Sequence, residues 1–194
     1  MNKLLLAVAL ATAFTAPAFA ALKVGDTAPD FTAKASLGGK EFTFSLADAL
    51  KKGPAVVYFY PSAYTGGCDL EAHTFAGSAD KFAAAGASII GVSADNMERL
   101  NQFAADPAFC AGKFPIASDE SLKVANSYNL STTPPRDGAK DVRGVEIGHG
   151  FIERVTYVIG KDHKILAVMS STADKLTPDQ HVDKSLAIVQ QIKS

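Results

Sequence analysis

The sequence contains little cysteine and lacks the paired redox motif of thioredoxins. Its 194 residues include two cysteines, Cys68 and Cys110, and no Cys-x-x-Cys occurs. A thioredoxin-type oxidoreductase needs that spacing for its reactive pair, so this class is excluded. The two cysteines remain available for a structural disulfide or for chemistry on a single thiol.

Strong charge and long apolar runs are also absent. The 19 basic and 20 acidic side chains give a formal net charge of −1, which argues against nucleic acid or a charged membrane surface as partner. No apolar stretch reaches the roughly 20 residues that a membrane-spanning helix needs. With no repeat or low-complexity segment either, the composition is typical of a soluble globular protein.

The first twenty residues have the organisation of a secretory signal peptide. Lys3 precedes an apolar segment, residues 4–14, and Ala18-Phe19-Ala20 is typical of a cleavage site. Position 21 is Ala rather than Cys, which argues against a lipoprotein anchor. We therefore predict a signal peptide over 1–20, one domain over 21–194 and export to the periplasm. In an oxidising compartment, a structural Cys68–Cys110 disulfide stays open as an alternative.

Beyond residue 20, strand-like and helix-like segments alternate, which predicts an α/β fold with a mixed central sheet flanked by helices. We expect a hairpin over 32–44, helices near 46–51, 70–84, 96–105, 121–128 and 177–192, and strands near 55–60, 88–94, 114–117, 151–159 and 165–169. The expected inner faces are Leu70, Phe75, Phe82 and Ala83 in one long helix, and Val182, Leu186, Val189 and Ile192 in the last. Residues 131–150 are rich in Gly and Pro and predict an irregular functional or mobile loop.

The stretch 58–68 is the strongest functional signal. An apolar, β-branched run ends at Pro61, Gly66 and Gly67 permit a tight turn, and a helical pattern with an early acidic residue, Asp69, follows. Cys68 is thereby predicted at the junction of a buried strand and a helix N-terminus. The helix dipole favours a thiolate there, so we expect a pKa below the free-thiol value of about 8.5.

The spacing of Pro61, Thr65 and Cys68 resembles the active-site loop of the peroxiredoxins, and Val24 to Phe31 resembles the opening segment of the same family. The resemblance implies a thioredoxin-like fold with an N-terminal hairpin and an insertion. It also implies a thiol-dependent peroxidase that reduces hydrogen peroxide and small organic hydroperoxides without a metal or organic cofactor. Cys68 would then be the peroxidatic cysteine.

The same resemblance assigns three supporting residues. Arg154, within Arg154-Val155-Thr156, resembles the family's arginine beside the reactive cysteine, where it would stabilise the thiolate and bind peroxide. Thr65 would offer its hydroxyl to peroxide, and Pro61 would shield Cys68 from water. Each has a purely structural alternative: a surface arginine paired with Glu153, a turn-stabilising threonine and a strand terminator.

Glu71 follows Cys68 by three residues, as in the bacterioferritin-comigratory or Q-type subgroup, but His73 stands where many members have a resolving cysteine. The resemblance then implies that Cys110 resolves Cys68 within one chain, through a Cys68–Cys110 disulfide. Because both cysteines belong to one chain, we expect a monomer, and because the chain is predicted to be exported, we expect an exported or periplasmic dithiol protein to reduce it. A Cys68–His73 metal pair is the rival and lacks a third ligand nearby. We assign no role to the other histidines and expect them to be solvated.

Two other functions remain open at this point. One is an exported thioredoxin-fold module with a structural disulfide, and the other is a protein that exchanges disulfides with other proteins. Counting thiols lost against limiting peroxide separates them, because a peroxidase consumes one peroxide for each pair of thiols. If Cys110 does resolve Cys68, we expect the two sulfurs to lie well apart in the reduced protein. The first turn after Gly67, or residues 106–112, would then have to unwind.

Overall fold

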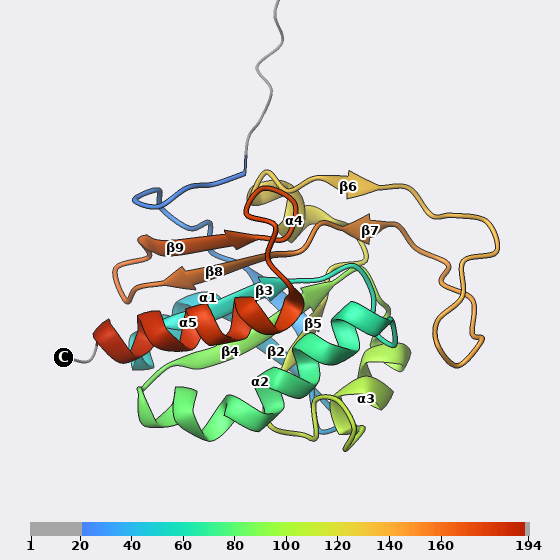
Figure 1. Ribbon diagram of the computed structural model, residues 1–194, viewed down its shortest axis with the longest axis horizontal. Coiled ribbons are helices and arrows are strands. Elements are labelled where there is room, and N and C mark those ends of the chain that lie inside the picture. Colours follow the sequence, from blue (N-terminus) through green and yellow to red (C-terminus); the bar gives the residue numbers. More distant parts are fainter. Residues whose placement is uncertain (1–20, 193–194) are drawn as a thin grey trace, which may run out of the picture.

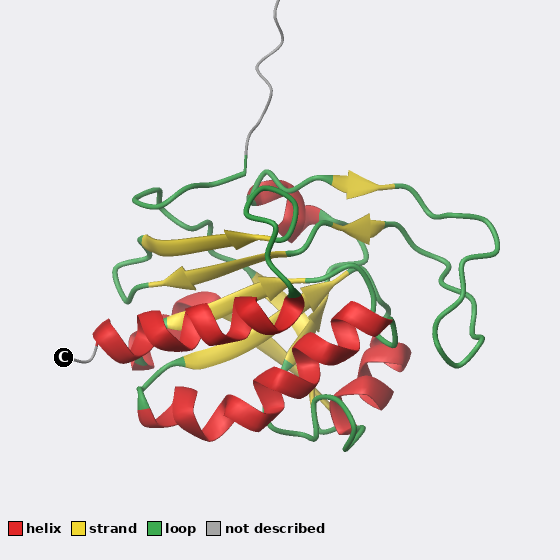
Figure 2. Ribbon diagram, viewed as in Figure 1, coloured by secondary structure: helices red, strands yellow, loops and turns green. Residues whose placement is uncertain are grey.

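The structure, a computed structural model that describes residues 21–192, is built around a seven-stranded mixed sheet (Figures 1 and 2). The predicted signal peptide, residues 1–20, lies outside the described residues. In spatial order the strands are β2 (Lys40–Ser45), β1 (Thr32–Leu37), β5 (Ile116–Ser118), β4 (Ser88–Ser93), β3 (Ala55–Phe59), β8 (Val155–Ile159) and β9 (Ile165–Ser170).

The pairing of the strands explains why the sheet is mixed. β3, β4 and β5 run parallel, joined by helical crossovers, whereas β1, β2, β8 and β9 pair antiparallel with their neighbours. Gly38 and Gly39 form the tip of the β1–β2 hairpin with φ angles of 57° and 82°. A two-residue turn of this kind needs positive φ at both central positions, which glycine adopts without a steric cost. The predicted hairpin is therefore confirmed.

Helices cover both faces of the sheet. They are α1 (Leu46–Lys52), α2 (Gly66–Ala84), α3 (Met97–Ala105), α4 (Lys123–Ser127) and α5 (Pro178–Ile192). In Figure 1, α2 and α5 lie side by side in front of the sheet, while α1 and α4 lie behind it. Among residues 21–192 no helix combines the length and the apolar character that a membrane span requires.

The central strand β3 supplies both cores. Val57 and Phe59 pack into the cluster with α1 and α4, whereas Val56 and Tyr58 pack into the cluster with α2, α3 and α5. Successive side chains of a strand point to opposite faces, so a strand covered on both sides is apolar throughout. All five residues of β3 are buried, which confirms the buried central strand expected from the sequence.

The predicted inner face of α2 was partly wrong. The helix begins at Gly66 rather than Leu70, and Leu70 is 46% exposed. Its buried side chains are Cys68, Glu71, Ala72, Phe75, Ala79 and Phe82. The buried residues follow the spacing i, i+3, i+4 and i+7 from Cys68, and at this spacing Leu70 and Ala83 fall on the outer side of the helix.

The inner face of α5 also differs from the prediction. Val182 and Val189 are buried as expected, but Ile192 is 44% exposed near the helix end. Two polar residues of α5 that the prediction left out of the inner face, His181 and Ser185, are completely buried. The prediction from apolar spacing therefore missed the polar contact between His181 of α5 and Thr156 of β8.

The strand predicted over 151–159 is broken into two pieces. β7 (Phe151–Ile152) pairs with β6 (Thr132–Thr133) in a separate small sheet, and β8 starts only at Val155. Glu153 and Arg154 occupy the break. The loop predicted over 131–150 thus contains the short strand β6 near its start and an isolated bridge between Lys140 and Glu146.

The contact between β3 and β4 yields a test of the packing. A Cβ atom added at Gly91 would lie 2.6 Å from the buried ring of Tyr58. We expect Gly91→Ala to lower the free energy of unfolding by about 1–3 kcal/mol, because the ring has to move within a filled core. Gly77→Ala, on the open face of α2, is the matched control and should add about 0.5–1 kcal/mol. Urea unfolding of the reduced protein measures both, and equal effects would contradict the packing argument.

Candidate active site

The loop between β3 and α2 positions Cys68. Pro61 follows the strand, Tyr64 has a left-handed φ of 57°, and Thr65 occupies the N-cap position with extended backbone. Cys68 therefore lies in the first turn of α2, as the sequence predicted, and its residue is 3% exposed. The backbone N–H of Cys68 donates to the carbonyl of Thr65 at 2.7 Å, so this group is already engaged within the turn.

Arg154 lies directly against the sulfur. Its Nη2 donates to Sγ of Cys68 at 3.1 Å, while Nη1 pairs with the carboxylate of Glu71. The Arg154 side chain is 10% exposed, so the alternative of a surface arginine paired with Glu153 is wrong. Gly67 keeps the approach open, because a Cβ there would lie 3.3 Å from Arg154 Nη2.

Burial changes the expected ionisation of Cys68. Desolvation raises the pKa of the thiol, and the opposing effects of Arg154 and Thr65 do not offset it. The prediction of a lowered pKa is therefore wrong for this closed arrangement. It considered the helix N-terminus and the cation but had no measure of how completely the sulfur leaves water.

Glu71 is a site residue to which the sequence analysis gave no role. Its side chain is fully buried, with one oxygen on Arg154 and the other 4.0 Å from Nδ1 of His181. Burial raises the pKa of Glu71 to about 8, although Arg154 pulls it down. A proton on Glu71 cancels its negative charge, which leaves the charge of Arg154 to a Cys68 thiolate. A glutamate three residues after a helix-start cysteine was the available signal.

Thr65 and Pro61 lie at the mouth of the site. The Thr65 hydroxyl donates to the carbonyl of Ser62 at 2.7 Å, so toward a ligand its oxygen acts as a hydrogen-bond acceptor. Pro61, Thr65 and Arg154 all line one cavity of about 520 Å³. The structure thus brings together all three predicted supporting residues around the Cys68 loop.

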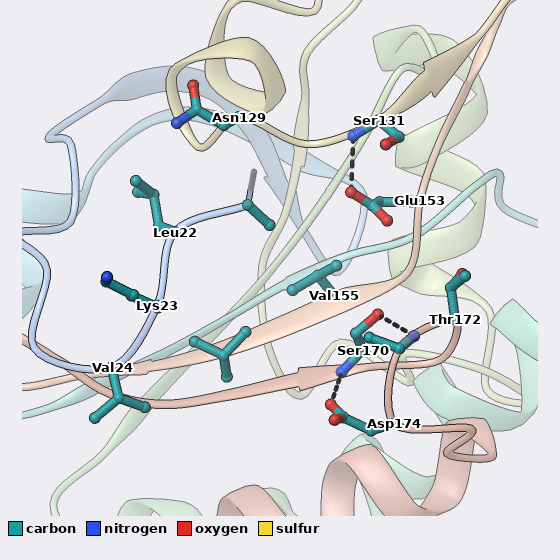
Figure 3. Close-up of a pocket in the computed structure, with 13 residues that line it drawn as sticks. Leu22, Lys23, Val24, Asn129, Ser131, Glu153, Val155, Ser170, Thr172 and Asp174 are labelled. Atoms are coloured by element: carbon teal, nitrogen blue, oxygen red, sulfur yellow. Dashed lines mark hydrogen bonds between the residues drawn. The ribbon is translucent and has the colours of Figure 1, made fainter. Parts of the chain in front are cut away.

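A second cavity, of about 630 Å³, adjoins the first and is drawn in Figure 3. The two share Ser131, Glu153 and Thr172 in their linings, and in Figure 3 the Glu153 carboxylate accepts a hydrogen bond from the Ser131 backbone. None of the predicted site residues lines this second cavity. Pro61, Thr65 and Arg154 line the smaller, neighbouring cavity instead.

Comparison with known proteins places these features in a family. Residues 24–168 match the AhpC/TSA family. The chain belongs to this family. Its members include peroxiredoxins, so the thioredoxin-like peroxiredoxin fold and a thiol-dependent peroxidase activity expected from the sequence are confirmed. Peroxiredoxins act on peroxides and take electrons from thioredoxin-like reductants.

Individual relatives agree in sequence and in structure. The chloroplastic peroxiredoxin Q of Sedum lineare is 32% identical, over 90% of this chain and 82% of its own length. The crystal structure of peroxidoxin BcpB from Mycobacterium tuberculosis is 32% identical with a TM-score of 0.71, covering 89% of this chain and 99% of that one. A peroxiredoxin Q structure from Xanthomonas campestris is 25% identical with a TM-score of 0.61, covering 83% and 91%. The resemblance to the Q-type subgroup is thereby confirmed.

A buried carboxylate anchors the loop of this peroxiredoxin that leads from β3 to α2, residues 60–65, which we call the reactive loop. Asp95 follows β4 at the same edge of the sheet, its side chain is fully buried, and five groups surround its oxygens. They are the backbone N–H of Ala63 (2.8 Å), the hydroxyls of Ser62 (2.8 Å) and Ser93 (2.7 Å), Nε2 of His149 (2.7 Å) and Nε of Arg99 (2.9 Å). The loop therefore takes its shape from an acid whose role the sequence analysis missed.

The insertion, residues 131–150, also contacts the loop at Tyr64. The Arg143 guanidinium lies 3.3 Å from the centroid of the Tyr64 ring, and the N–H of Val142 donates to the Tyr64 carbonyl at 3.0 Å. Asp141, whose side chain is fully buried, holds both Arg143 and Arg99 at 2.8 Å. The Gly- and Pro-rich stretch is thus a structured part of the site rather than a free loop.

Cys110 lies in a turn segment, residues 107–112, within the loop predicted over 106–112, but its side chain is completely buried. Both cysteines are free thiols and belong to the same apolar cluster. Burial raises the pKa of Cys110 far above its ordinary value. The neighbouring Phe109 packs on Tyr64 and Phe103, with ring centroids 5.4 Å and 5.0 Å apart. Tyr64 therefore connects the loop before Cys68 to α3 and to the Cys110 segment.

The expectation that the remaining histidines are solvated is wrong for two of them. His181 on α5 is fully buried between the hydroxyls of Thr156 and Ser171, at 2.9 Å and 3.0 Å, and burial lowers its pKa to about 4. The side chain of His149 is 20% exposed and is held by Asp95. Neither position follows an apolar pattern, so the sequence carried no signal for it.

His73, which replaces the common resolving cysteine, bonds the segment that contains the actual second cysteine. Its Nδ1 donates to the carbonyl of Ala108 at 3.0 Å. Within residues 21–192 no group of three or more His, Cys, Asp or Glu side chains converges as a metal site would require. The Cys68–His73 pair accordingly has no third ligand there.

The Asp95–His149 pair predicts a pH dependence of stability. Burial alone would lower the pKa of His149, but its hydrogen bond to Asp95 raises it above 6.5. Burial alone would raise the pKa of Asp95. The hydrogen bonds from His149 and from backbone donors outweigh burial and lower this pKa below 3.8. A raised histidine pKa stabilises the fold below pH 6.5 and ceases to do so above the folded-state value. The carboxylate contribution is lost as the pH falls below 3.8.

We therefore expect the difference in unfolding free energy between the parent and His149→Gln to shrink as the pH rises from about 6 to about 9. Urea titrations of reduced protein at four pH values measure it. His163→Gln is the matched control, since His163 makes no ion pair within the described part of the chain. A constant difference for His149→Gln would show that the pair does not stabilise the fold through its charge.

Proposed function

We propose that this peroxiredoxin is exported and that Cys68 is its peroxidatic cysteine, with Arg154, Thr65 and Pro61 binding and orienting peroxide. The observation that carries the proposal is the 3.1 Å contact between Arg154 Nη2 and Cys68 Sγ at the edge of a cavity. One guanidinium can donate to the thiolate and to a peroxide oxygen at the same time. An acceptor at Thr65 and a wall without N–H groups at Pro61 complete the pocket.

The first chemical step is attack of the Cys68 thiolate on the terminal oxygen of the hydroperoxide. The O–O bond breaks, a sulfur–oxygen bond forms, and the other oxygen leaves with a proton as water or an alcohol. Cys68 becomes a sulfenic acid, the first reversible product of cysteine oxidation. Arg154 stabilises the negative charge that shifts from sulfur to the leaving oxygen.

Cys110 is proposed as the resolving cysteine. Its thiol attacks the sulfenic sulfur, a disulfide forms and water leaves. Both thiols are buried in the same packed core, so the proposed disulfide involves a local opening of the segments around them. Tyr64 is central to this opening, because it belongs to the loop before Cys68 and its ring contacts Arg143 and the Phe109 side chain beside Cys110.

The proposed setting is the periplasm, since the signal-peptide pattern of residues 1–20 supports export. The disulfide would be reduced there by a dithiol protein with a thioredoxin-like fold. Both proposed redox cysteines belong to one chain, which favours a monomer as the working unit. The bacterioferritin comigratory protein of Xanthomonas campestris, which this chain resembles in structure, has alkyl peroxide reduction activity. That likeness supports organic hydroperoxides as substrates here.

Replacing Arg154 tests the proposed role of its guanidinium. Arg154→Lys keeps a cation but loses the planar fork, and we expect the rate constant of Cys68 with hydrogen peroxide to fall about 10²-fold. Stopped-flow measurements in a Cys110→Ser background isolate this step. Alkylation of Cys68 by iodoacetamide across pH, in the same variants, separates loss of thiolate from loss of peroxide binding.

A second variant keeps this test independent of folding. Arg154→Met alone leaves the buried Glu71 side chain without its hydrogen-bond donor, which is costly, so it is combined with Glu71→Gln. The double variant should show a higher Cys68 pKa than the parent and a still slower peroxide reaction. If either variant reacts with peroxide as fast as the parent, Arg154 has no part in the chemistry.

Replacing Cys110 tests resolution. We expect Cys110→Ser to consume one equivalent of peroxide, to stop as the Cys68 sulfenic acid, and to reach sulfinic acid when more peroxide is added. The parent should consume one peroxide and lose both thiols together. Mass spectrometry before and after limiting peroxide distinguishes these products.

Normal turnover of Cys110→Ser with a protein dithiol donor would contradict the proposed disulfide and assign resolution to an external thiol. A parent protein whose two thiols disappear without consumption of peroxide would instead favour a structural disulfide. Fast thiol exchange with an unrelated protein disulfide would favour the exchange function. Cys68→Ser, which lacks the proposed nucleophile, is the control and should leave peroxide unchanged.

A further inference from the structure

The cavity beside Arg154 is much larger than hydrogen peroxide requires. Its volume is about 520 Å³, whereas a water molecule occupies about 30 Å³ in the liquid. It extends from Pro61 and Thr65 along the break between β7 and β8. An organic hydroperoxide would therefore fill space that the smaller peroxide leaves to water.

The walls of this cavity are apolar near the reactive loop and cationic farther out. Pro61, Phe151 and Ile152 supply apolar surface, and Arg136 comes from the insertion after β6. The Arg136 guanidinium lies 5.0 Å from the centroid of the Phe151 ring, a cation–π contact that holds it over the cavity wall. This exposed cation thus lies beside the same Phe151 ring that lines the apolar part of the cavity.

Arg136 makes no ion pair or side-chain hydrogen bond to any of residues 21–192. Arg154, the other cation of the lining, is already engaged with Cys68 and Glu71. The acidic residue of the lining, Glu153, directs a carboxylate oxygen to the Ser131 N–H at 2.7 Å, as Figure 3 shows. The cavity therefore presents one cation that is available to a ligand.

We propose that Arg136 determines substrate specificity by binding the carboxylate of an anionic organic hydroperoxide whose peroxide group reaches Cys68. This rests on the proposed function, because it uses the same reactive site. The apolar body of the substrate packs on Phe151 and Ile152 between the two ends. Arg136 takes no part in the oxygen transfer, and the alcohol product keeps the carboxylate unchanged.

Three probes separate charge from size. They are hydrogen peroxide, cumene hydroperoxide carrying a para carboxylate, and the methyl ester of that acid. The rate constant for Cys68 oxidation is measured with each in the Cys110→Ser background. We expect the acid to react faster than the ester in the parent, and the ratio to fall roughly two- to fivefold in Arg136→Gln, as for an exposed ion pair. Arg136→Glu should reverse the preference.

The controls test whether the effect belongs to this position. Arg136→Lys should keep most of the acid-to-ester ratio, and Lys140→Gln, which removes an exposed cation of the same insertion outside the cavity, should keep all of it. The ratio in the parent should decrease with added salt, because exposed charges are screened. Hydrogen peroxide should react at the same rate in all of these proteins.

An acid-to-ester ratio that is unchanged in both Arg136→Gln and Arg136→Glu would overturn the proposal. So would an equal loss of rate with all three probes, since that would mean Arg136 only supports the fold of the loop. If the parent fails to react even with hydrogen peroxide, the proposed function itself is wrong, and the specificity proposal falls with it. Reaction with hydrogen peroxide but no charge discrimination removes only the specificity proposal.

Discussion

A guanidinium held between a thiol and a buried carboxylic acid is the interaction on which the site depends. Arg154 lies in the break between β7 and β8, outside the strand pairing on either side, and its side chain reaches Cys68. Glu71 binds the other nitrogen of the Arg154 guanidinium. Because the pKa of Glu71 is raised, its negative charge neutralises less of the positive charge of Arg154. Burial of the sulfur opposes ionisation, so reactivity depends on the balance among these three groups.

A second constraint fixes the shape of the loop before Cys68. The Asp95 carboxylate binds the backbone and side chain of two loop residues, and Tyr64 adopts a left-handed backbone conformation that is uncommon for an aromatic residue. The ring of Tyr64 is enclosed by Arg143 and by the phenylalanines near Cys110. The order of the loop and the burial of the second thiol are consequently one cooperative arrangement.

The sequence carried enough information for the fold, the reactive loop and Arg154, because each depends on local patterns such as β-branched runs and the spacing of Pro61, Thr65 and Cys68. It failed where a residue acts through a distant partner. The pKa of Cys68, the burial of His181 and the anchoring by Asp95 depend on which elements pack together in three dimensions. The break at Glu153 and Arg154 was missed, although these two consecutive polar residues interrupt the alternation of a continuous strand.

The insertion of residues 131–150 is electrostatically interlocked with the rest of the domain, and this limits how freely evolution or engineering can exchange it. It contributes Asp141, Arg143 and His149, while the core contributes Asp95 and Arg99. Removal of the insertion would strip Asp95 and Arg99 of partners and leave the buried carboxylate with fewer cations. A homologue with a shorter connection therefore has to change the positions of Asp95 and Arg99 as well, so the insertion and these core residues are exchanged together.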